Sequence, residues 1–276
     1  KEKNKIVFTE HVLPAYENLK NCMNSLKNTG VNDKGLCYLP EGKDYYTYRI
    51  HSYTGTSFSI PELEKQVQKQ RETDLAEISN LIAAHPSLAS SSSDSFCDSN
   101  PTNMLHSLKE SILEDFPTPV ETNFTVKYVD DALSDYLAPA FYLTAPIDDI
   151  SQNCIYTKVK LFTTLAHEGY PGHLYQTIMT ASYGIPSIRS ILNYPGYTEG
   201  WATYVEMMSY HYTGLDENLA TILQLNQSAI LSLYSTADFG IHYDGWSFSD
   251  TKSFFYKYGF SDEKTIREIY ELIVEE

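Results

Sequence analysis

The chain is poor in three features that would identify common classes of protein. Its 276 residues contain 4 cysteines with no C-x-x-C pair, which argues against a thiolate zinc site. No stretch approaches the roughly 20 apolar residues needed to cross a bilayer, so no transmembrane segment is expected. Only 20 basic residues stand against 36 acidic ones, for a formal charge of -16. Such a charge would repel phosphate backbones, so nucleic-acid binding is not expected.

What the chain does contain is enough apolar sequence for a sizeable core. Hydrophobic residues make up 42% of it, and no convincing repeat or linker divides it. We therefore expect a single domain over residues 1–276. Its first part, 1–120, should be mainly helical, and its second part, 121–276, should carry a small sheet and the helices of a metal site.

Helical periodicity predicts most of the secondary structure. Apolar positions at helical spacing predict a helix over 6–28. Ser59 and Glu62 form the N-cap and capping box of a long helix that continues to about residue 83. A Ser-rich stretch at 85–103 predicts a surface loop. Further helices are expected at residues 103–114, 158–170, 172–183, 197–212, 217–238, 247–257 and 261–276.

Two stretches favour extended structure instead. YYTYRIHSYTGT at residues 45–56 is rich in tyrosine and β-branched side chains, which are common in strands. Between residues 121 and 157 the apolar period shifts towards 2, and TNFTVKYV, AFYLTAP and NCIYTKV are each typical of a strand. The predicted fold class is therefore mainly α with a small β-sheet.

The stretch LAHEGYPGHLYQ at residues 165–176 holds two histidines six positions apart. In a regular helix this step turns the side chains by roughly 240° net and separates them by about 9 Å, so His167 and His173 would point apart. Pro171 cannot bond the carbonyl of His167 and clashes with it, and the flanking glycines give the backbone freedom to open there. A break that absorbs two residues would return His173 to the face of His167, where the two imidazoles could share a metal ion.

A third ligand has to come from elsewhere in the chain. A catalytic zinc ion takes three protein ligands and keeps one position open, and two histidines with one glutamate are a common set. YTEGWATYVEMM at residues 197–208 offers Glu199 and Glu206, seven residues apart and nearly in phase on a helix. We expect Glu199 as the ligand and Glu206 as a hydrogen-bond partner of a histidine ligand. Glu168 would then take a proton from the attacking water.

Other interpretations of the same residues stay open. Glu199 lies in the first turn of its expected helix, where a carboxylate also stabilises the helix dipole without any metal. His242, in DFGIHYDGWS, could donate a hydrogen bond to an oxyanion as a catalytic residue, or could cap a helix end. Tyr170 and Tyr197 neighbour the expected ligands and could bind substrate or pack in the core.

LAHEGYPGHLYQ and TEGWATYVE together resemble the DUF885 family of bacterial proteins, which its H-E-x-x-x-x-H motif groups with gluzincin-like metallopeptidases. The resemblance extends over nearly the whole chain, through GLCYLPEGKDYY, APAFYLTAP and DFGIHYDGWS. TEGWATYVE is also similar to the NEGFASYVE helix of gluzincin aminopeptidases, whose glutamate is the third zinc ligand. The resemblance implies a zincin-like (gluzincin-type) metallopeptidase architecture with zinc as cofactor, with His167, His173 and Glu199 as ligands, Glu168 as base, and Glu206 outside the first shell.

The function expected on these grounds is zinc-dependent hydrolysis of a peptide or other amide bond. The alternative is a non-catalytic, exported peptide-binding protein on the same fold. Glu168 favours the enzyme, because binding alone does not need a carboxylate beside the first ligand. Family members are usually longer at both ends, so we expect this chain to be a fragment that could be inactive by itself. An exported or cell-surface location is expected over a cytoplasmic one, and no oligomeric state is predicted.

Overall fold

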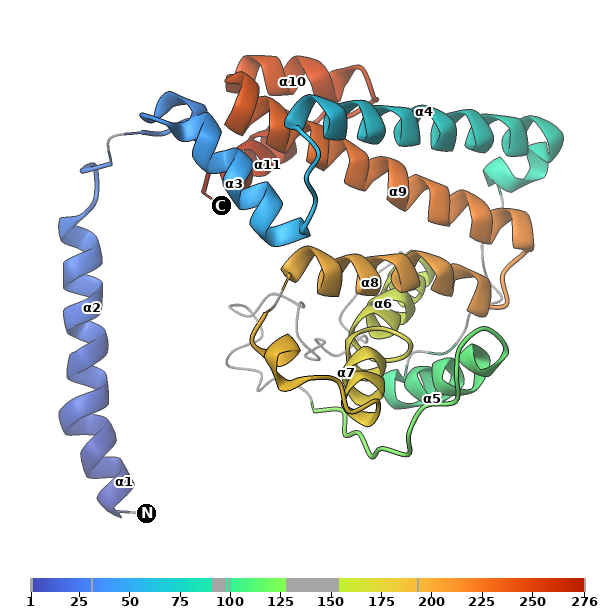
Figure 1. The fold of residues 1–276 in the computed structure, drawn as a ribbon, viewed down its shortest axis with the longest axis horizontal. Helices are drawn as coiled ribbons and strands as arrows, with labels where there is room; N and C mark the ends of the chain where they lie inside the picture. Colours follow the sequence, from blue (N-terminus) through green and yellow to red (C-terminus); the bar gives the residue numbers. More distant parts are fainter. Residues whose placement is uncertain are drawn as a thin grey trace. The chain divides into compact units, whose positions relative to one another are not determined.

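Helices and the loops between them make up the described part of the chain. A computed structural model describes residues 2–30, 32–90, 98, 100–127, 154–192 and 194–275, and these residues contain no β-strand (Figure 1). They group into two compact units, one of residues 1–46 and 240–276 and the other of residues 47–239. The single domain expected over residues 1–276 stays a prediction, because two compact units can belong to one domain.

The first unit combines the two ends of the chain. Its helices are α1 (Glu2–Val7), α2 (Leu13–Ser25), α10 (Phe248–Tyr256) and α11 (Glu263–Glu275), with π-helical turns η1 (Phe8–Val12) and η9 (Gly240–Asp244). The predicted helix over 6–28 is thus present, and it buries none of its own residues. Helix α10 packs against α11, and η9 packs against the short 3-10 helix η2 (Leu36–Tyr38).

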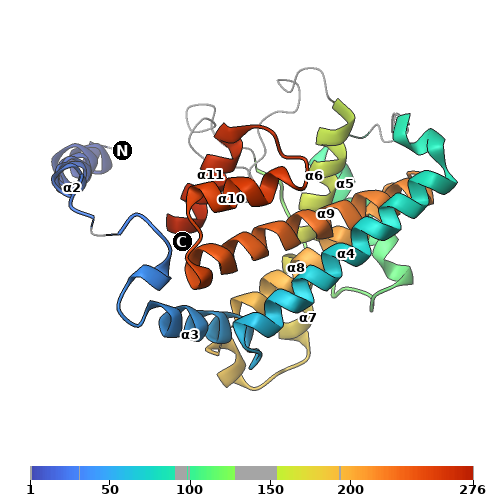
Figure 2. The ribbon, with the colours of Figure 1, turned by 90° about the horizontal axis from the view of Figure 1, so that it is seen from above.

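The second unit contains the helices α4 (Ile60–Ala84), α5 (Pro101–Ser111), α6 (Cys154–Glu168), α7 (His173–Ser182), α8 (Pro195–Met208) and α9 (Glu217–Phe239). The expected metal ligands lie on α6, α7 and α8. Helices α4 and α9 lie side by side along their length, and α6 packs on both α5 and α8 (Figure 2). Helix α3 (Gly42–Thr54) runs from the first unit into the second.

Helix-start signals in the sequence explain where two of these helices begin. The backbone N–H of Ser59 donates to Oε2 of Glu62 at 2.8 Å, so the predicted capping box of α4 is confirmed. Asn100 caps α5, where its side-chain oxygen accepts from the N–H groups of Thr102 and Asn103 at 2.9 and 3.1 Å. Helix α5 and α6 then bury one shared apolar cluster, which includes Leu108, Ile112, Phe162, Leu165 and Ala166.

The predicted sheet, and with it the zincin-like α+β architecture, is wrong. Residues 122–127 form no regular structure, and the last expected strand, at 153–159, lies mostly within helix α6. The β-branched residues of this stretch resemble a strand locally, but Val159 and Phe162 are buried at helical spacing against α5. The middle expected strand, at 140–146, lies outside the described residues.

The extended segment expected at residues 45–56 is also wrong, because most of it belongs to α3. Tyr46 is 4% exposed and stacks on the ring of His242, with ring centroids 5.4 Å apart. Strand propensity mainly measures how a side chain packs on a pleated surface. Here the tyrosine packs from a helix instead, and tertiary contact overrides the local preference.

A buried polar seam holds α4 against α9. Arg71 and Asp74 of α4 are 3% and 1% exposed. Arg71 donates to the carbonyl of Ser232 at 3.1 Å and to the hydroxyl of Thr236 at 2.8 Å, and Ser228 donates to Asp74 at 2.6 Å. Buried charges are tolerated when they are hydrogen-bonded in this way, so the seam specifies how the two helices pair.

We expect Asp74→Ala to lower the free energy of unfolding by about 3 kcal/mol, because it leaves buried polar partners without an acceptor. The matched control is Glu77→Ala on the exposed side of α4, which should change stability by less than about 0.5 kcal/mol. Urea denaturation of both variants measures the difference. Equal losses in the two variants would contradict a stabilising role for the seam.

Candidate metal centre

A tight turn joins the two histidine-bearing helices. Helix α6 ends at Glu168 and α7 begins at His173, so the helix break predicted at the proline is confirmed. The N–H of Gly172 donates to the carbonyl of Ala166 at 2.9 Å. A Cβ atom at Gly172 would lie 1.7 Å from the carbonyl oxygen of His167, closer than any real contact. Only glycine fits this position, and the turn returns the chain onto the end of α6.

The turn brings the two imidazole rings into contact. The ring centroids of His167 and His173 are 4.9 Å apart, and the ring planes are nearly perpendicular at 86°. The indole Nε1 of Trp201 donates to the carbonyl of Pro171 at 2.9 Å, which ties the turn to helix α8. Sequence reasoning missed this contribution of Trp201, although the residue lies within the same motif as Glu199.

Helix α8 adds a carboxylate to the pair of rings. Oε2 of Glu199 lies 3.5 Å from Nε2 of His167 and 3.5 Å from Nε2 of His173. The three ligand atoms all lie within 4.8 Å of one another. Zinc bonds of about 2.0–2.1 Å place neighbouring ligands of a tetrahedron roughly 3.3 Å apart, so the two separations from Glu199, each 3.5 Å, are close to those around a zinc ion.

The hydrogen bond on the far side of His167 orients the ring towards this cluster. Nδ1 of His167 lies 3.0 Å from Oε2 of Glu206. An ionised carboxylate can only accept, so the proton of a neutral ring is on Nδ1, and the lone pair of Nε2 faces Glu199. A lone pair facing a carboxylate oxygen is repulsive unless a cation, either a proton or a metal ion, lies between them.

Electrostatics keep Glu206 in the accepting form. Burial raises its pKa, but the hydrogen bond from His167 and the charge of Lys160 outweigh this and lower the pKa to about 2. For His167, burial lowers the pKa, and the carboxylates of Glu206, Glu168 and Glu199 raise it, with a net increase. The cluster therefore attracts positive charge, as a site for a cation should.

The expected base lies at the end of α6, beside the first ligand. Burial raises the pKa of Glu168, while the nearby His167 and His173 oppose that rise. A carboxyl group with a raised pKa accepts a proton more readily near neutral pH than an ordinary surface glutamate does. The position and the direction of this shift both suit proton transfer.

The two tyrosines expected to bind substrate lie in different surroundings. Tyr170 is 0% exposed and packs edge-on against Phe124, and its hydroxyl has no hydrogen-bond partner within the described part of the chain. It forms part of the core, so its proposed contact with substrate has no support in its location. Tyr197 is 73% exposed in the first turn of α8. Its expected role stays a prediction.

His242, the expected oxyanion donor, belongs to the first compact unit. Its ring is 3% exposed, and Nδ1 accepts from the N–H of Leu36 at 3.1 Å. Nε2 lies 2.7 Å from the carbonyl oxygen of Ile273 and so donates to it. Both ring nitrogens therefore take part in packing η9 within its own unit, and the catalytic role stays a prediction without geometric support.

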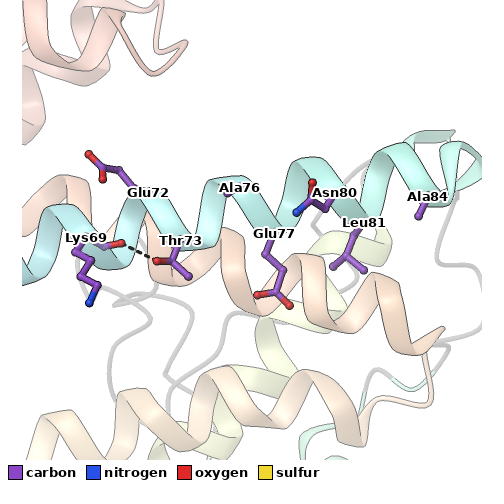
Figure 3. A pocket seen from close by; sticks show the side chains of 8 residues that line it. All are labelled: Lys69, Glu72, Thr73, Ala76, Glu77, Asn80, Leu81 and Ala84. Atoms are coloured by element: carbon purple, nitrogen blue, oxygen red, sulfur yellow. Dashed lines mark hydrogen bonds between the residues drawn. The ribbon is translucent and has the colours of Figure 1, made fainter.

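A hollow along the outer face of α4 does not involve the cluster. Its lining residues all come from that one helix, and Figure 3 shows them ranged along it: Lys69, Glu72, Thr73, Ala76, Glu77, Asn80, Leu81 and Ala84. None of them is a histidine or a residue of the expected site. In the described residues, the three-ligand cluster is the one group of this kind with metal-binding spacing.

Comparison with known proteins gives a family and a fold. A family described as "Bacterial protein of unknown function (DUF885)" matches residues 1–271. A crystal structure from Colwellia psychrerythraea, provisionally described as a lipoprotein, matches with a TM-score of 0.74 at 18% identity over 96% of this chain and 51% of that one. A structure from Shewanella oneidensis, provisionally described as a lipoprotein of unknown function, matches with a TM-score of 0.64 at 13% identity over 97% and 55%.

This chain therefore spans about half the length of those solved structures. No curated protein matches its sequence. Among the helices described, none combines the length and the apolar character needed to pass through a membrane. Sequence identity to the two solved structures is only 18% and 13%, so the likeness supports the helical fold and carries no conclusion about function.

We expect the purified chain to bind about one zinc ion, and His173→Ala to lose it, because two remaining ligands hold zinc far more weakly than three. The matched control is His211→Ala, whose ring bonds Glu217 and Gln224 outside the cluster. Elemental analysis after dialysis against zinc measures the stoichiometry. Zinc retained by His173→Ala would contradict this ligand set.

Proposed function

This chain belongs to the DUF885 family of bacterial proteins, and we propose that it is a zinc-dependent hydrolase that cleaves peptide bonds. One observation carries the proposal. Oε2 of Glu199 lies 3.5 Å from Nε2 of both His167 and His173, at the spacing of ligands around zinc. Glu168, with its raised pKa, lies beside these ligands at the position of a base.

The choice of a hydrolytic centre over a structural one follows from the number of ligands. Structural zinc sites are closed by four protein ligands, whereas a catalytic site keeps one position for water or substrate. The described cluster offers three ligands. Glu199 is also 60% exposed at its side chain, so the cluster is open on the side of α8. An open position next to a base favours catalysis.

Each residue of the site would have its own role in hydrolysis. Zinc in such a site supplies Lewis acidity, which polarises a carbonyl group and makes water a better nucleophile. Glu168 would accept a proton from the water as its oxygen bonds to the carbonyl carbon, and would deliver that proton to the leaving amine as the peptide C–N bond breaks. His167, His173 and Glu199 would hold the ion, and Glu206 holds the ring of His167 in the tautomer that presents Nε2.

We also propose an extracytoplasmic location for this hydrolase. The two solved structures that share its fold are provisionally described as lipoproteins, and this likeness supports an exported or cell-surface location. A hydrolase outside the cytoplasm would act on peptides present there.

We expect Glu168→Gln to keep about one zinc per chain and to lower peptide hydrolysis by at least a factor of about 100, because the amide cannot accept a proton. Glu77→Gln on α4 is the matched control and should hydrolyse as the wild type does. A mixture of peptides analysed by mass spectrometry detects new termini without assuming a specificity. Unchanged hydrolysis in Glu168→Gln would contradict the mechanism, and peptide binding without any cleavage would favour a non-catalytic binding protein.

We expect the protein to be recovered with the membrane or exported fraction when cells of its bacterial source are separated into compartments. Immunoblotting of each fraction, with a cytoplasmic enzyme followed in parallel, measures the distribution. Recovery with the cytoplasmic enzyme alone would contradict the proposed location and would leave the proposed chemistry intact.

A further inference from the structure

The carboxylate of Glu206 is divided between two partners from one helix. Its Oε1 accepts from Nζ of Lys160 at 2.6 Å, and its Oε2 accepts from Nδ1 of His167 at 3.0 Å. Glu206 itself is 7% exposed on helix α8. Lys160 therefore reaches a proposed metal ligand through one buried carboxylate, although it touches neither the ligand atoms nor a substrate.

Helical geometry makes this arrangement possible. Lys160 and His167 are seven residues apart on α6, as Glu199 and Glu206 are on α8, and such a step is close to two full turns. Each pair thus presents both side chains on one face. Lys160, early in α6, pairs with Glu206, late in α8, whereas His167, late in α6, lies beside both Glu199 and Glu206. The two helices therefore run in opposite directions, and their basic and acidic side chains alternate along the contact.

A nearby glutamine adds to the polar surroundings of the carboxylate. Gln227, on α9, helps to lower the pKa of Glu206. The hydroxyl of Tyr210 donates to Oε1 of Gln227 at 2.9 Å, so the amide N–H₂ is the part of that side chain that can act as a donor. With Oε1 held by an ammonium group, the plane of the carboxylate is set, and Oε2 is directed at the imidazole.

We propose that Lys160 is a positioning residue for the metal centre, which holds Oε1 of Glu206 so that Oε2 keeps the proton of His167 on Nδ1 and Nε2 towards the metal. This inference rests on the proposed function, because a positioning role matters only if the site binds a metal. The effect of Lys160 on the tautomer of His167 can nevertheless be tested without any metal. Outer partners of metal-binding histidines commonly change metal affinity 10–100-fold when they are removed. Lys160 acts one contact further away, so the lower end of that range applies.

The test compares Lys160→Met with Lys160→Arg. Methionine keeps an unbranched stem as far as Cε and loses the donor, whereas arginine keeps a charged donor. In the metal-free chain at about pH 9, where a free imidazole is neutral, nitrogen NMR of the histidine rings should show His167 with its proton on Nδ1 in the wild type and in Lys160→Arg. Lys160→Met should show a second form with the proton on Nε2.

Zinc affinity gives the second measurement. Competition with a chelator should show about tenfold weaker binding in Lys160→Met and near wild-type binding in Lys160→Arg. Lys69→Met, on the outer face of α4, is the matched control and should bind zinc as the wild type does. A wild-type tautomer in Lys160→Met would overturn the inference, whatever the zinc affinity of that variant.

Two precautions keep the outcomes distinct. Lys160→Gln provides a second neutral variant if Lys160→Met does not fold, and it should shift the tautomer in the same direction. If the wild type binds no zinc, the proposed function fails, while the tautomer comparison in the metal-free chain still decides the role of Lys160. An unchanged tautomer with intact zinc binding in the wild type would instead refute the inference alone.

Discussion

The close approach of Gly172 to the carbonyl of His167 is the constraint on which the rest of the site depends. No side chain fits between these two backbones, since a Cβ would lie 1.7 Å from the oxygen. This contact lets α7 begin after the short turn of residues 169–172, with its first residue, His173, against the last turn of α6. A regular helix through the same residues would separate the two rings and abolish the cluster.

Helix α8 supplies the remaining residues of the site. It supplies Glu199 within 3.5 Å of Nε2 of both histidines, Glu206 as the partner of Nδ1 of His167, and Trp201 as a donor to the carbonyl of Pro171 in the turn. These three contacts come from one helix packed against α6 and α7, so the separation of the candidate ligand atoms is set by the packing of three helices. Sites placed on helices in this way are more precise than sites on loops.

The helical parts of the fold were more predictable than the rest, because the signals for a helix come from residues that are close together in the sequence. Capping at Ser59 and Pro61, together with apolar periods near 3.6, identifies α4 and most other helices from residues that are close in sequence. The strand predictions failed at residues 45–56 and 153–159, most of which form helices, and Tyr46 and Val159 are buried there on α3 and α6. The strand propensity of a residue does not determine which other residues its side chain will pack against.

The sequence by itself determined the ligand types, their order and the need for a break at Pro171, because donor chemistry and backbone sterics belong to each residue. Only the tertiary structure decided that Glu199 lies 3.5 Å from Nε2 of both histidines, that Tyr170 and His242 are buried, and that Lys160 reaches His167 through Glu206. Those facts depend on how helices distant in sequence pack together, and the sequence of any one helix does not specify its partner.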